Sequence, residues 1–303
     1  MSNLEVLSSY LLIDNGKLFY NIINKIPIHE EYFQNLRMNY ENMILSDHTP
    51  VRLPKKLSGL NFDIISYNIL NSNDKSVIDI FTRDLLAQIF IGRDWRGMKP
   101  IQQNIFEVFQ SLEEFKNEQL VNFIKKYPNT VFLFQEVSSR CLSFLKEHLS
   151  GEFHIFDTKV DDKIKAGPKV YIKDEKRVTL VPKSIMTNNR NNKNELNTLR
   201  GNVDNIKNML TVKIGDTLIV NLHNHWKLGQ TNIRYLVEQV INKRNVSKII
   251  MMGDFNNSKE NIEKQIGDFK VIGTYEQTFL GNINCSSKLD NAIIIEKKLN
   301  KNF

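Results

Sequence analysis

A short apolar run in the second half of the chain, residues 248–252, ends at Gly253 and is followed at once by Asp254, Phe255 and Asn256. A run of this length that stops at a glycine is typical of a buried β-strand that delivers polar side chains to the edge of a sheet. A carboxylate can accept a proton or orient a water, and an amide beside it can hold a second oxygen. Together they suit hydrolysis at a charged centre such as phosphorus. The alternative interpretation is an Asp/Asn turn after a strand.

Four further apolar runs place polar residues at the ends of predicted strands. Oxygen ligands without cysteine suit a hard cation such as Mg²⁺ or Mn²⁺, and such an ion together with histidine would polarise a phosphate and organise an attacking water. Each residue alone has a structural explanation: Asn68 could cap a turn, Glu136 could begin a helix, and His223 could be a half-buried structural histidine. The runs and their polar residues are residues 62–70 with Asn68, residues 131–136 with Glu136, residues 218–222 with His223 and residues 288–295 with Asp290.

The order of strands and helices predicts a layered α/β domain. Residues 77–90 and 138–149 have the apolar periodicity of helices, and each follows a predicted strand, which argues for helices packed on a sheet. Residues 51–53 and 62–69 are expected to be neighbouring antiparallel strands, because only a short connection separates them.

The composition fits one soluble globular domain. With 303 residues, 41% of them hydrophobic, and no internal repeat or Pro/Gly-rich linker, we expect a single domain over residues 44–303 with residues 1–43 as an extension packed on it. Two cysteines, Cys141 and Cys285, cannot supply a disulfide framework or a cysteine-based metal site, which excludes a zinc finger. We therefore expect a protein of the reducing cytoplasm or nucleus. No uncharged apolar stretch is long enough to span a bilayer, and no signal peptide pattern is present.

The positive charge of the chain is concentrated in one region. The formal net charge of +7 and the pI of about 9.1 favour an acidic partner only mildly for a chain of this length. Residues 159–207 contain 12 Lys or Arg against 6 Asp or Glu and carry most of this excess. The region is either a solvated surface loop or a positively charged rim that attracts polyanions.

Together and in this order, the motifs resemble those of the endonuclease/exonuclease/phosphatase superfamily, the DNase I-like proteins. The most specific parts are residues 135–136 and 253–256. The sequence of residues 67–70 and the Asn-x-His of residues 221–223 are most similar to the motifs of the deadenylase-like nuclease branch. The resemblance covers residues 44–296 in pieces. It implies a four-layer α/β/β/α sandwich of two mainly antiparallel sheets with helices outside.

One motif stands at an unexpected place. In this family a Ser-Asp-His motif precedes a closing strand that lies beyond the strand of Asp290, but no histidine follows Asp290 here. Ser46-Asp47-His48 reproduces the motif ahead of all the others. We infer a circular permutation, which is physically allowed because the family's first and last strands are neighbours that a short connection can join. A chance match is the alternative.

The resemblance also implies a role for each residue in hydrolysing a phosphate ester. Asp254 would position or deprotonate the attacking water, Asn256 would orient it, and His223 would stabilise charge on the phosphate oxygens. His48, held by Asp290, would contact the phosphate or act as the acid/base partner. Whether Asp254 or His48 is the general base stays open. The implied ligands for Mg²⁺ or Mn²⁺ are Glu136, Asn68 and Asp47.

A nuclease acting on DNA or RNA is the favoured interpretation of the substrate. The loop with Arg93, Trp95 and Arg96, together with Arg177, offers phosphate contacts and an aromatic ring that could stack on a base. Trp95 could equally be a packed loop anchor. A phosphatase for a phosphoinositide or another small phosphate ester would use the same type of site. A catalytically silent nucleic-acid-binding protein on the same scaffold is the third interpretation.

Overall fold

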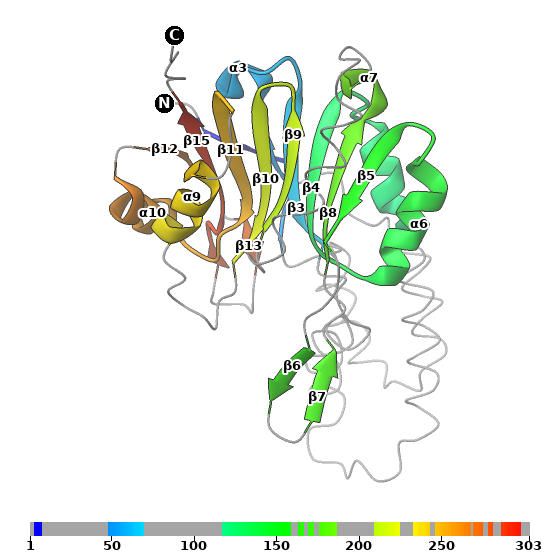
Figure 1. Ribbon diagram of the computed structural model, residues 1–303. Helices are drawn as coiled ribbons and strands as arrows, with labels where there is room; N and C mark the ends of the chain where they lie inside the picture. Colours follow the sequence, from blue (N-terminus) through cyan, green and yellow to red (C-terminus); the bar gives the residue numbers. More distant parts are fainter. Residues whose placement is uncertain are drawn as a thin grey trace, which may run out of the picture.

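Two β-sheets pack face to face, and helices cover the outer face of each sheet, so that the chain forms four layers (Figure 1). This arrangement confirms the predicted four-layer α/β/β/α sandwich of two mainly antiparallel sheets. The computed structural model describes residues 3–7, 48–69, 117–158, 163–166, 169–172, 176–186, 209–224, 233–242, 246–267, 269–274, 278–280 and 286–297.

The first sheet has six strands, of which β3 and β4 run parallel while every other neighbouring pair is antiparallel. Its outer face is covered by α6 (Ser139–Leu149) and by a helical segment at residues 117–125. In spatial order the strands are β1 (Glu5–Val6), β2 (Val51–Leu53), β3 (Asp63–Asn68), β4 (Thr130–Val137), β8 (Lys176–Pro182) and β5 (Phe153–Asp157).

The second sheet has five strands, of which β10 and β11 run parallel and the other pairs antiparallel. Its outer face is covered by α9 (Ile233–Asn242) and α10 (Lys259–Ile266). In spatial order the strands are β12 (Lys270–Ile272), β15 (Asp290–Glu296), β11 (Lys248–Asp254), β10 (Thr217–His223) and β9 (Met209–Ile214).

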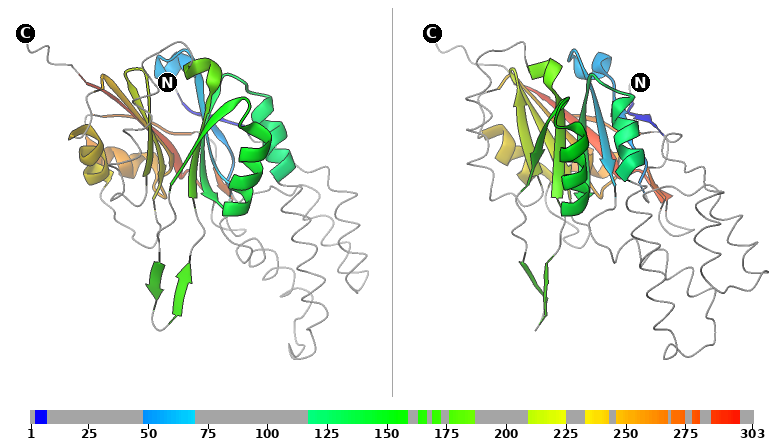
Figure 2. Two further views of the ribbon diagram at one scale, coloured as in Figure 1. Left: turned by 45° about the vertical axis from the view of Figure 1, so that its right-hand side comes forward. Right: turned by 90° about the vertical axis from the view of Figure 1, so that its right-hand side faces the viewer.

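Smaller elements lie around this sandwich. A hairpin of β6 and β7 projects from one end of it, as both views of Figure 2 show. No helix in the described part of the chain is long and apolar enough to cross a membrane. The smaller elements are β6 (Lys163–Ala166), β7 (Lys169–Ile172), β13 (Phe279–Leu280), β14 (Ser286–Ser287), α3 (Lys55–Ser58) and α7 (Lys183–Met186).

Alternating side chains of the central strands fill the spaces between the layers. In β4, Leu133 lies between the two sheets and Phe134 packs on the opposite face against α6. In β11, Ile250 lies between the sheets and Ile249 packs against the outer helices. Because both faces are covered, these strands appear in the sequence as continuous apolar runs. Each such fully buried side chain contributes about 1.5–3 kcal/mol to folding.

Several predicted elements are confirmed. Strands β2 and β3 are antiparallel neighbours, joined through α3. Helix α6 follows β4, as predicted for residues 138–149, and strands β9 and β10 form a hairpin. The helix predicted at residues 77–90 lies outside the described residues.

The N-terminal residues also contribute to the first sheet. Strand β1 pairs with β2 at the sheet's edge, and Leu4 is buried between the sheets. Some residues of the predicted extension are therefore integral to the sandwich. The division of the chain at residue 43 itself stays a prediction, because residues 8–47 lie outside the described part.

The topology brings the polar strand ends to one end of the sandwich. Within each sheet the parallel pair, β3 with β4 and β10 with β11, ends on the same side. Strand β15 begins there because it runs antiparallel to β11. The hairpin of β6 and β7 projects from this same end (Figure 1).

Candidate active site

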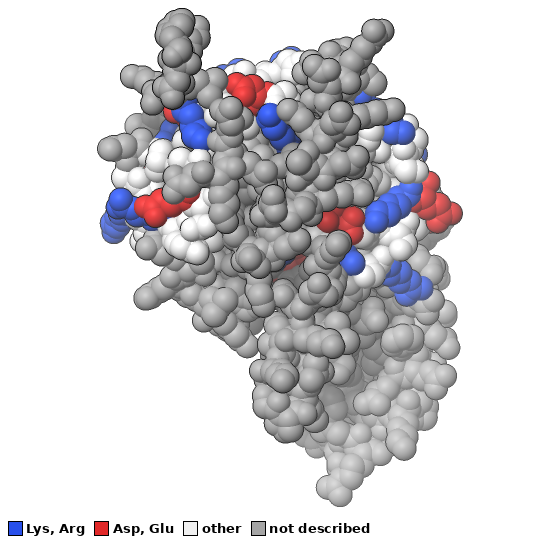
Figure 3. Space-filling model, viewed as in Figure 1, with Lys and Arg blue, Asp and Glu red and all other residues white. Residues whose placement is uncertain are grey.

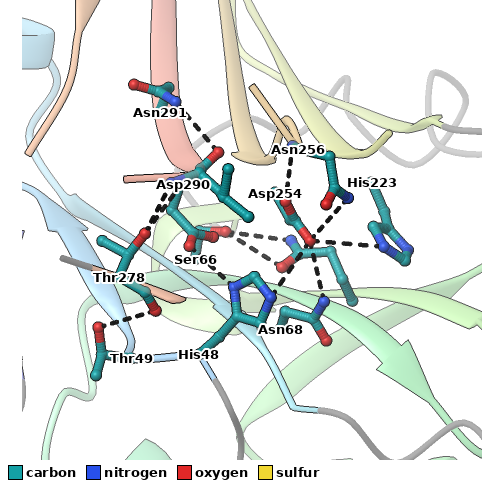
Figure 4. A network of polar contacts seen from close by, with 12 residues as sticks. His48, Thr49, Ser66, Asn68, His223, Asp254, Asn256, Thr278, Asp290 and Asn291 are labelled. Carbon is teal, nitrogen blue, oxygen red and sulfur yellow. Dashed lines mark hydrogen bonds and ion pairs between the residues drawn. The ribbon is translucent and has the colours of Figure 1, made fainter. Parts of the chain in front are cut away.

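The carboxylate of Asp254 lies at the centre of the polar residues at this end of the sandwich (Figure 4). Its Oδ2 accepts hydrogen bonds from the side-chain amides of Asn68 and Asn256, both at 3.2 Å. The same oxygen lies 3.6 Å from Nε2 of His48 and 3.6 Å from Nε2 of His223. Two imidazoles and two amides, carried by four separate parts of the chain, thus converge on one carboxylate oxygen.

Gly253 allows the strand that carries Asp254 to approach its parallel neighbour. Gly253 is paired with Leu222 and has φ of 152°, and a Cβ at this position would lie 1.9 Å from the Leu222 carbonyl oxygen. Only glycine fits this approach and this backbone conformation. The next pair in the register is His223 with Asp254, so the glycine sets the distance between these two side chains.

The segment after Asp254 is indeed a turn, as the alternative interpretation of the sequence proposed. The backbone N–H of Asn256 donates to Asp254 Oδ1 at 2.8 Å, and Asn256 has a left-handed φ of 48°. Its side chain also donates to the carbonyl of Asn224, which follows β10. The turn aims the Asn256 amide at Asp254, so a turn at this position is compatible with a role of Asn256 in the site.

His48 lies between two carboxylates. Its Nδ1 is 3.1 Å from Oδ2 of Asp290, the contact that the resemblance implied, and its Nε2 faces Asp254. Asp254 and Asp290 are opposite each other in the register of β11 and β15. Because a carboxylate only accepts hydrogen bonds, Nδ1 carries the proton toward Asp290. Nε2 is therefore the ring atom of His48 that can exchange a proton in the site.

Glu136 reaches the site from a β-bulge at the end of β4. The pairing of β4 with β8 shifts between Phe134 and Val137, and Glu136 has a left-handed φ of 54°. Bulges re-aim side chains in this way near active sites. The carboxylate Oε1 accepts from the Asn68 amide at 3.2 Å and lies 3.5 Å from Nε2 of His223.

Two buried amides span the sheets directly beneath the bulge. Asn221 donates to the carbonyls of Phe134 at 3.0 Å and Val178 at 3.1 Å, and its amide oxygen accepts from Gln135 at 2.7 Å. Gln135 donates further to Ser66 at 3.1 Å. The sequence motifs contained Gln135 and Asn221 but gave them no role; the structure shows that they satisfy strand carbonyls at the bulge. A polar residue within each apolar run was the available signal.

Burial dominates the electrostatics of Asp254, whose residue is only 1% exposed. Loss of solvation raises the pKa of its carboxyl above the ordinary value, and the nearby charge of Asp290 acts in the same direction. His48, His223 and the backbone hydrogen bond from Asn256 lower this pKa, but by less.

The oxygen donors at the edge of the site fit a hard divalent cation. The Glu136 carboxylate and the Asn68 amide are neighbours, and the Glu136 side chain is 15% exposed, so it borders solvent. In the described part of the chain, no three His, Cys, Asp or Glu side chains form a cluster that could hold a metal ion. Mg²⁺ is usually held by only one or two carboxylates and completes its shell with water and substrate phosphate, so the residues present fit such an ion.

The remaining predicted site residues are placed only in part. Arg177 lies in β8 between Lys176 and Val178, opposite the bulge that carries Glu136. Its backbone N–H donates to Thr158 at 3.1 Å. The predicted residues that lie outside the described part of the chain are Asp47, Arg93, Trp95 and Arg96.

Comparisons with known proteins identify solved structures that are similar at low sequence identity. No family model matches the sequence, and no curated protein matches it. A truncated TDP2 of Caenorhabditis elegans is 15% identical, with 59% of this chain and 76% of that chain covered and a TM-score of 0.38. An endonuclease/exonuclease/phosphatase of Bacteroides vulgatus is 13% identical, with coverages of 81% and 87% and a TM-score of 0.44. A mannosyl-6-phosphatase of Bacteroides thetaiotaomicron is 14% identical, with coverages of 76% and 84% and a TM-score of 0.41.

Similarity at this level does not assign an activity to this chain. Its fold and its site are defined by the contacts of its own residues. The described residues form two face-to-face sheets whose polar strand ends meet at one end. In this architecture and in its motifs, the chain resembles the endonuclease/exonuclease/phosphatase superfamily of DNase I-like proteins.

Proposed function

We propose that the chain is a divalent-metal-dependent phosphoesterase that hydrolyses phosphodiester bonds of nucleic acid. One observation carries the proposal: a buried carboxylate, Asp254, lies 3.6 Å from two imidazoles, and a second carboxylate, Asp290, holds one of them. A base, an acid and donors for phosphate oxygens are thereby gathered at one point. Glu136 borders this point with a carboxylate that can hold a cation.

Asp254 and His48 would carry out the proton transfers of the reaction. Asp254 Oδ2 would orient the attacking water and accept its proton. His48 Nε2 faces the same oxygen at 3.6 Å and can pass a proton to the leaving ester oxygen while Asp290 holds the ring through Nδ1. In this step the water oxygen bonds to phosphorus as the ester bond breaks, Asp254 takes one proton of the water, and the leaving oxygen takes the Nε2 proton of a His48 ring protonated on both nitrogens. Transfer of the Asp254 proton to His48 Nε2, 3.6 Å away, would restore the starting state.

His223 and Asn256 would act on the phosphate itself. Both place a side-chain nitrogen next to Asp254 Oδ2, and a bound phosphate could accept from these nitrogens in place of Asp254, so that they stabilise negative charge on its non-bridging oxygens. Glu136 and Asn68 would hold Mg²⁺ or Mn²⁺, which when bound polarises a phosphate oxygen. Asn68 has a second task, because its amide donates to both Glu136 and Asp254 and so fixes the two carboxylates relative to each other.

The preference for nucleic acid rests on the basic region of the chain. The β6–β7 hairpin projects from the end that carries the site, and its sequence includes Lys163, Lys165 and Lys169. Arg177 lies beside the bulge of Glu136. On the face seen in Figure 3, by contrast, the described basic side chains are interspersed with acidic ones. Phosphate contacts would therefore come from the hairpin and its flanking region.

We also propose that the Ser46-Asp47-His48 motif is the family's last motif moved to the front of the chain. In support, His48 directly precedes the segment that leads into β2, β2 pairs with β3, and α3 is the short connection between them. The imidazole of His48 contacts Asp254 and Asp290, although each of them is more than 200 residues away from His48 in the sequence.

The substrate class is tested by a panel of single- and double-stranded DNA, RNA, inositol phosphates and sugar phosphates, assayed with and without Mg²⁺ or Mn²⁺. We expect metal-dependent cleavage of at least one nucleic acid, with its rate lowered by at least about 100-fold in Asp254→Asn. Turnover of only the small phosphate esters would replace the nuclease by a phosphatase. Salt-sensitive binding to nucleic acid without any turnover would support the catalytically silent alternative.

A further inference from the structure

A buried threonine outside every sequence motif holds the backbone of Asp290. Thr278 directly precedes β13, and its residue is 0% exposed. Its hydroxyl oxygen accepts hydrogen bonds from two consecutive backbone N–H groups, those of Leu289 at 3.1 Å and Asp290 at 3.2 Å. The hydroxyl therefore fixes the point at which β15 begins.

The same threonine also holds the segment of His48. The carbonyl of Thr278 accepts the backbone N–H of Thr49 at 2.8 Å and lies 3.4 Å from the Thr49 hydroxyl. Thr49 follows His48 directly. One residue thus binds both chain segments whose side chains meet in the His48–Asp290 hydrogen bond (Figure 4).

The Asp290 carboxylate depends on this arrangement for its orientation. Its Oδ2 contacts His48 Nδ1 at 3.1 Å. Its Oδ1 is buried and has no hydrogen-bond partner among the described residues. Because no second hydrogen bond orients the carboxylate, its position relative to the imidazole follows from where the backbone of Asp290 is placed.

We propose that Thr278 is a positioning residue, which sets the geometry of the His48–Asp290 pair from behind the site. Removing its hydroxyl takes this partner from the buried N–H of Asp290 and the part-buried N–H of Leu289, and releases the start of β15. The imidazole then loses its fixed orientation toward Asp254. The effect on catalysis rests on the proposed function, whereas the effect on the hydrogen bond of His48 does not.

The test compares Thr278→Val, which removes the hydroxyl at nearly constant volume, with Thr278→Ser, which keeps it. The first readout is the Nδ1–H resonance of His48 in ¹H–¹⁵N NMR spectra, assigned by its absence in His48→Asn. We expect this resonance to shift or broaden in Thr278→Val and to stay at its wild-type position in Thr278→Ser. The matched control is Thr179→Val, because Thr179 is also buried and its hydroxyl has no hydrogen-bond partner among the described residues; it should leave the resonance unchanged.

The second readout is turnover of the substrate found in the panel. We expect kcat to fall at least about tenfold in Thr278→Val with KM within about twofold, and Thr278→Ser to restore it. In an Asp290→Asn background, Thr278→Val should lower kcat no further, because the threonine acts through Asp290. A role confined to stability would lower activity equally in both backgrounds.

The outcomes separate this proposal from the function it builds on. If the His48 resonance is unchanged in folded Thr278→Val, the positioning role is overturned whatever the activity. If the resonance moves but no protein in the series turns over any substrate, the positioning role stands and the proposed function fails. Should Thr278→Val not fold, Thr278→Cys takes its place with the same expected direction, because sulfur is a weaker acceptor than oxygen.

Discussion

His48→Asn lowers the rate of phosphate ester hydrolysis by about 10²–10⁴-fold, the range expected when an acid/base group is lost. Asparagine can still donate to Asp290 from the position of Nδ1, which is 3.1 Å away in the wild-type protein. It has no counterpart of Nε2, the ring atom that faces Asp254 at 3.6 Å. The proton carrier is thereby removed while the buried carboxylate keeps a partner.

Because Asp290 stays hydrogen-bonded, the free energy of unfolding of His48→Asn should change by no more than about 1 kcal/mol. Initial rates and urea denaturation of the same preparations measure both quantities. His148→Asn is the control, since His148 is exposed on α6 and bonds only locally, to the carbonyl of Phe144. Wild-type activity in His48→Asn would mean that the Ser46-Asp47-His48 motif is a chance match.

Gly253→Ala destabilises the protein by more than about 4 kcal/mol, a size reserved for severe steric or burial defects. The added Cβ would lie 1.9 Å from the Leu222 carbonyl oxygen, which belongs to the backbone of the neighbouring strand and cannot turn aside. The φ of 152° at this position is itself strained for any residue with a side chain. To relieve the clash with the Leu222 carbonyl and the strained φ, β10 and β11 must separate at the point where His223 and Asp254 are paired.

The measurement for this variant is urea denaturation, or the yield of soluble protein if the variant does not fold. Gly151→Ala is the matched control, because a Cβ there meets no atom within 4 Å, and its stability should stay within about 1 kcal/mol of wild type. A folded Gly253→Ala with wild-type stability would contradict the close approach of β10 and β11.

The sandwich could be predicted from the sequence because its strands are covered on both faces. Residues 131–134 and 249–252 are apolar without interruption, a pattern typical of strands that are covered on both faces. The polar residue that ends each run then predicts the end of the sheet at which the site forms. The contact of His48 with Asp290, which the resemblance implied, is observed at 3.1 Å.

Features created by long-range backbone geometry could not be predicted. The bulge that aims Glu136 depends on a register shift between β4 and β8, and no local pattern encodes such a shift. Thr278 acts through its hydroxyl on residues 11 and 12 positions later, within a connection that has no apolar periodicity. Strand β1 is only two residues long, too short to show a period. The bulge and β1 depend on remote strands, and Thr278 joins the start of β15 to Thr49, which is 229 positions away.

The most direct test of a metal-dependent phosphoesterase site is the hydrolysis rate of the best substrate, measured against Mn²⁺ concentration for the wild-type protein and Glu136→Gln. Glutamine keeps the size of the side chain and an oxygen for the Asn68 amide, which lies 3.2 Å from the wild-type carboxylate, but it removes the charge that a cation requires. We expect a rate that rises with Mn²⁺ and saturates in the wild-type protein, and a rate at least about 100-fold lower in Glu136→Gln. Equal rates in the two proteins, or a wild-type rate that does not depend on metal, would contradict a metal-dependent site at Glu136.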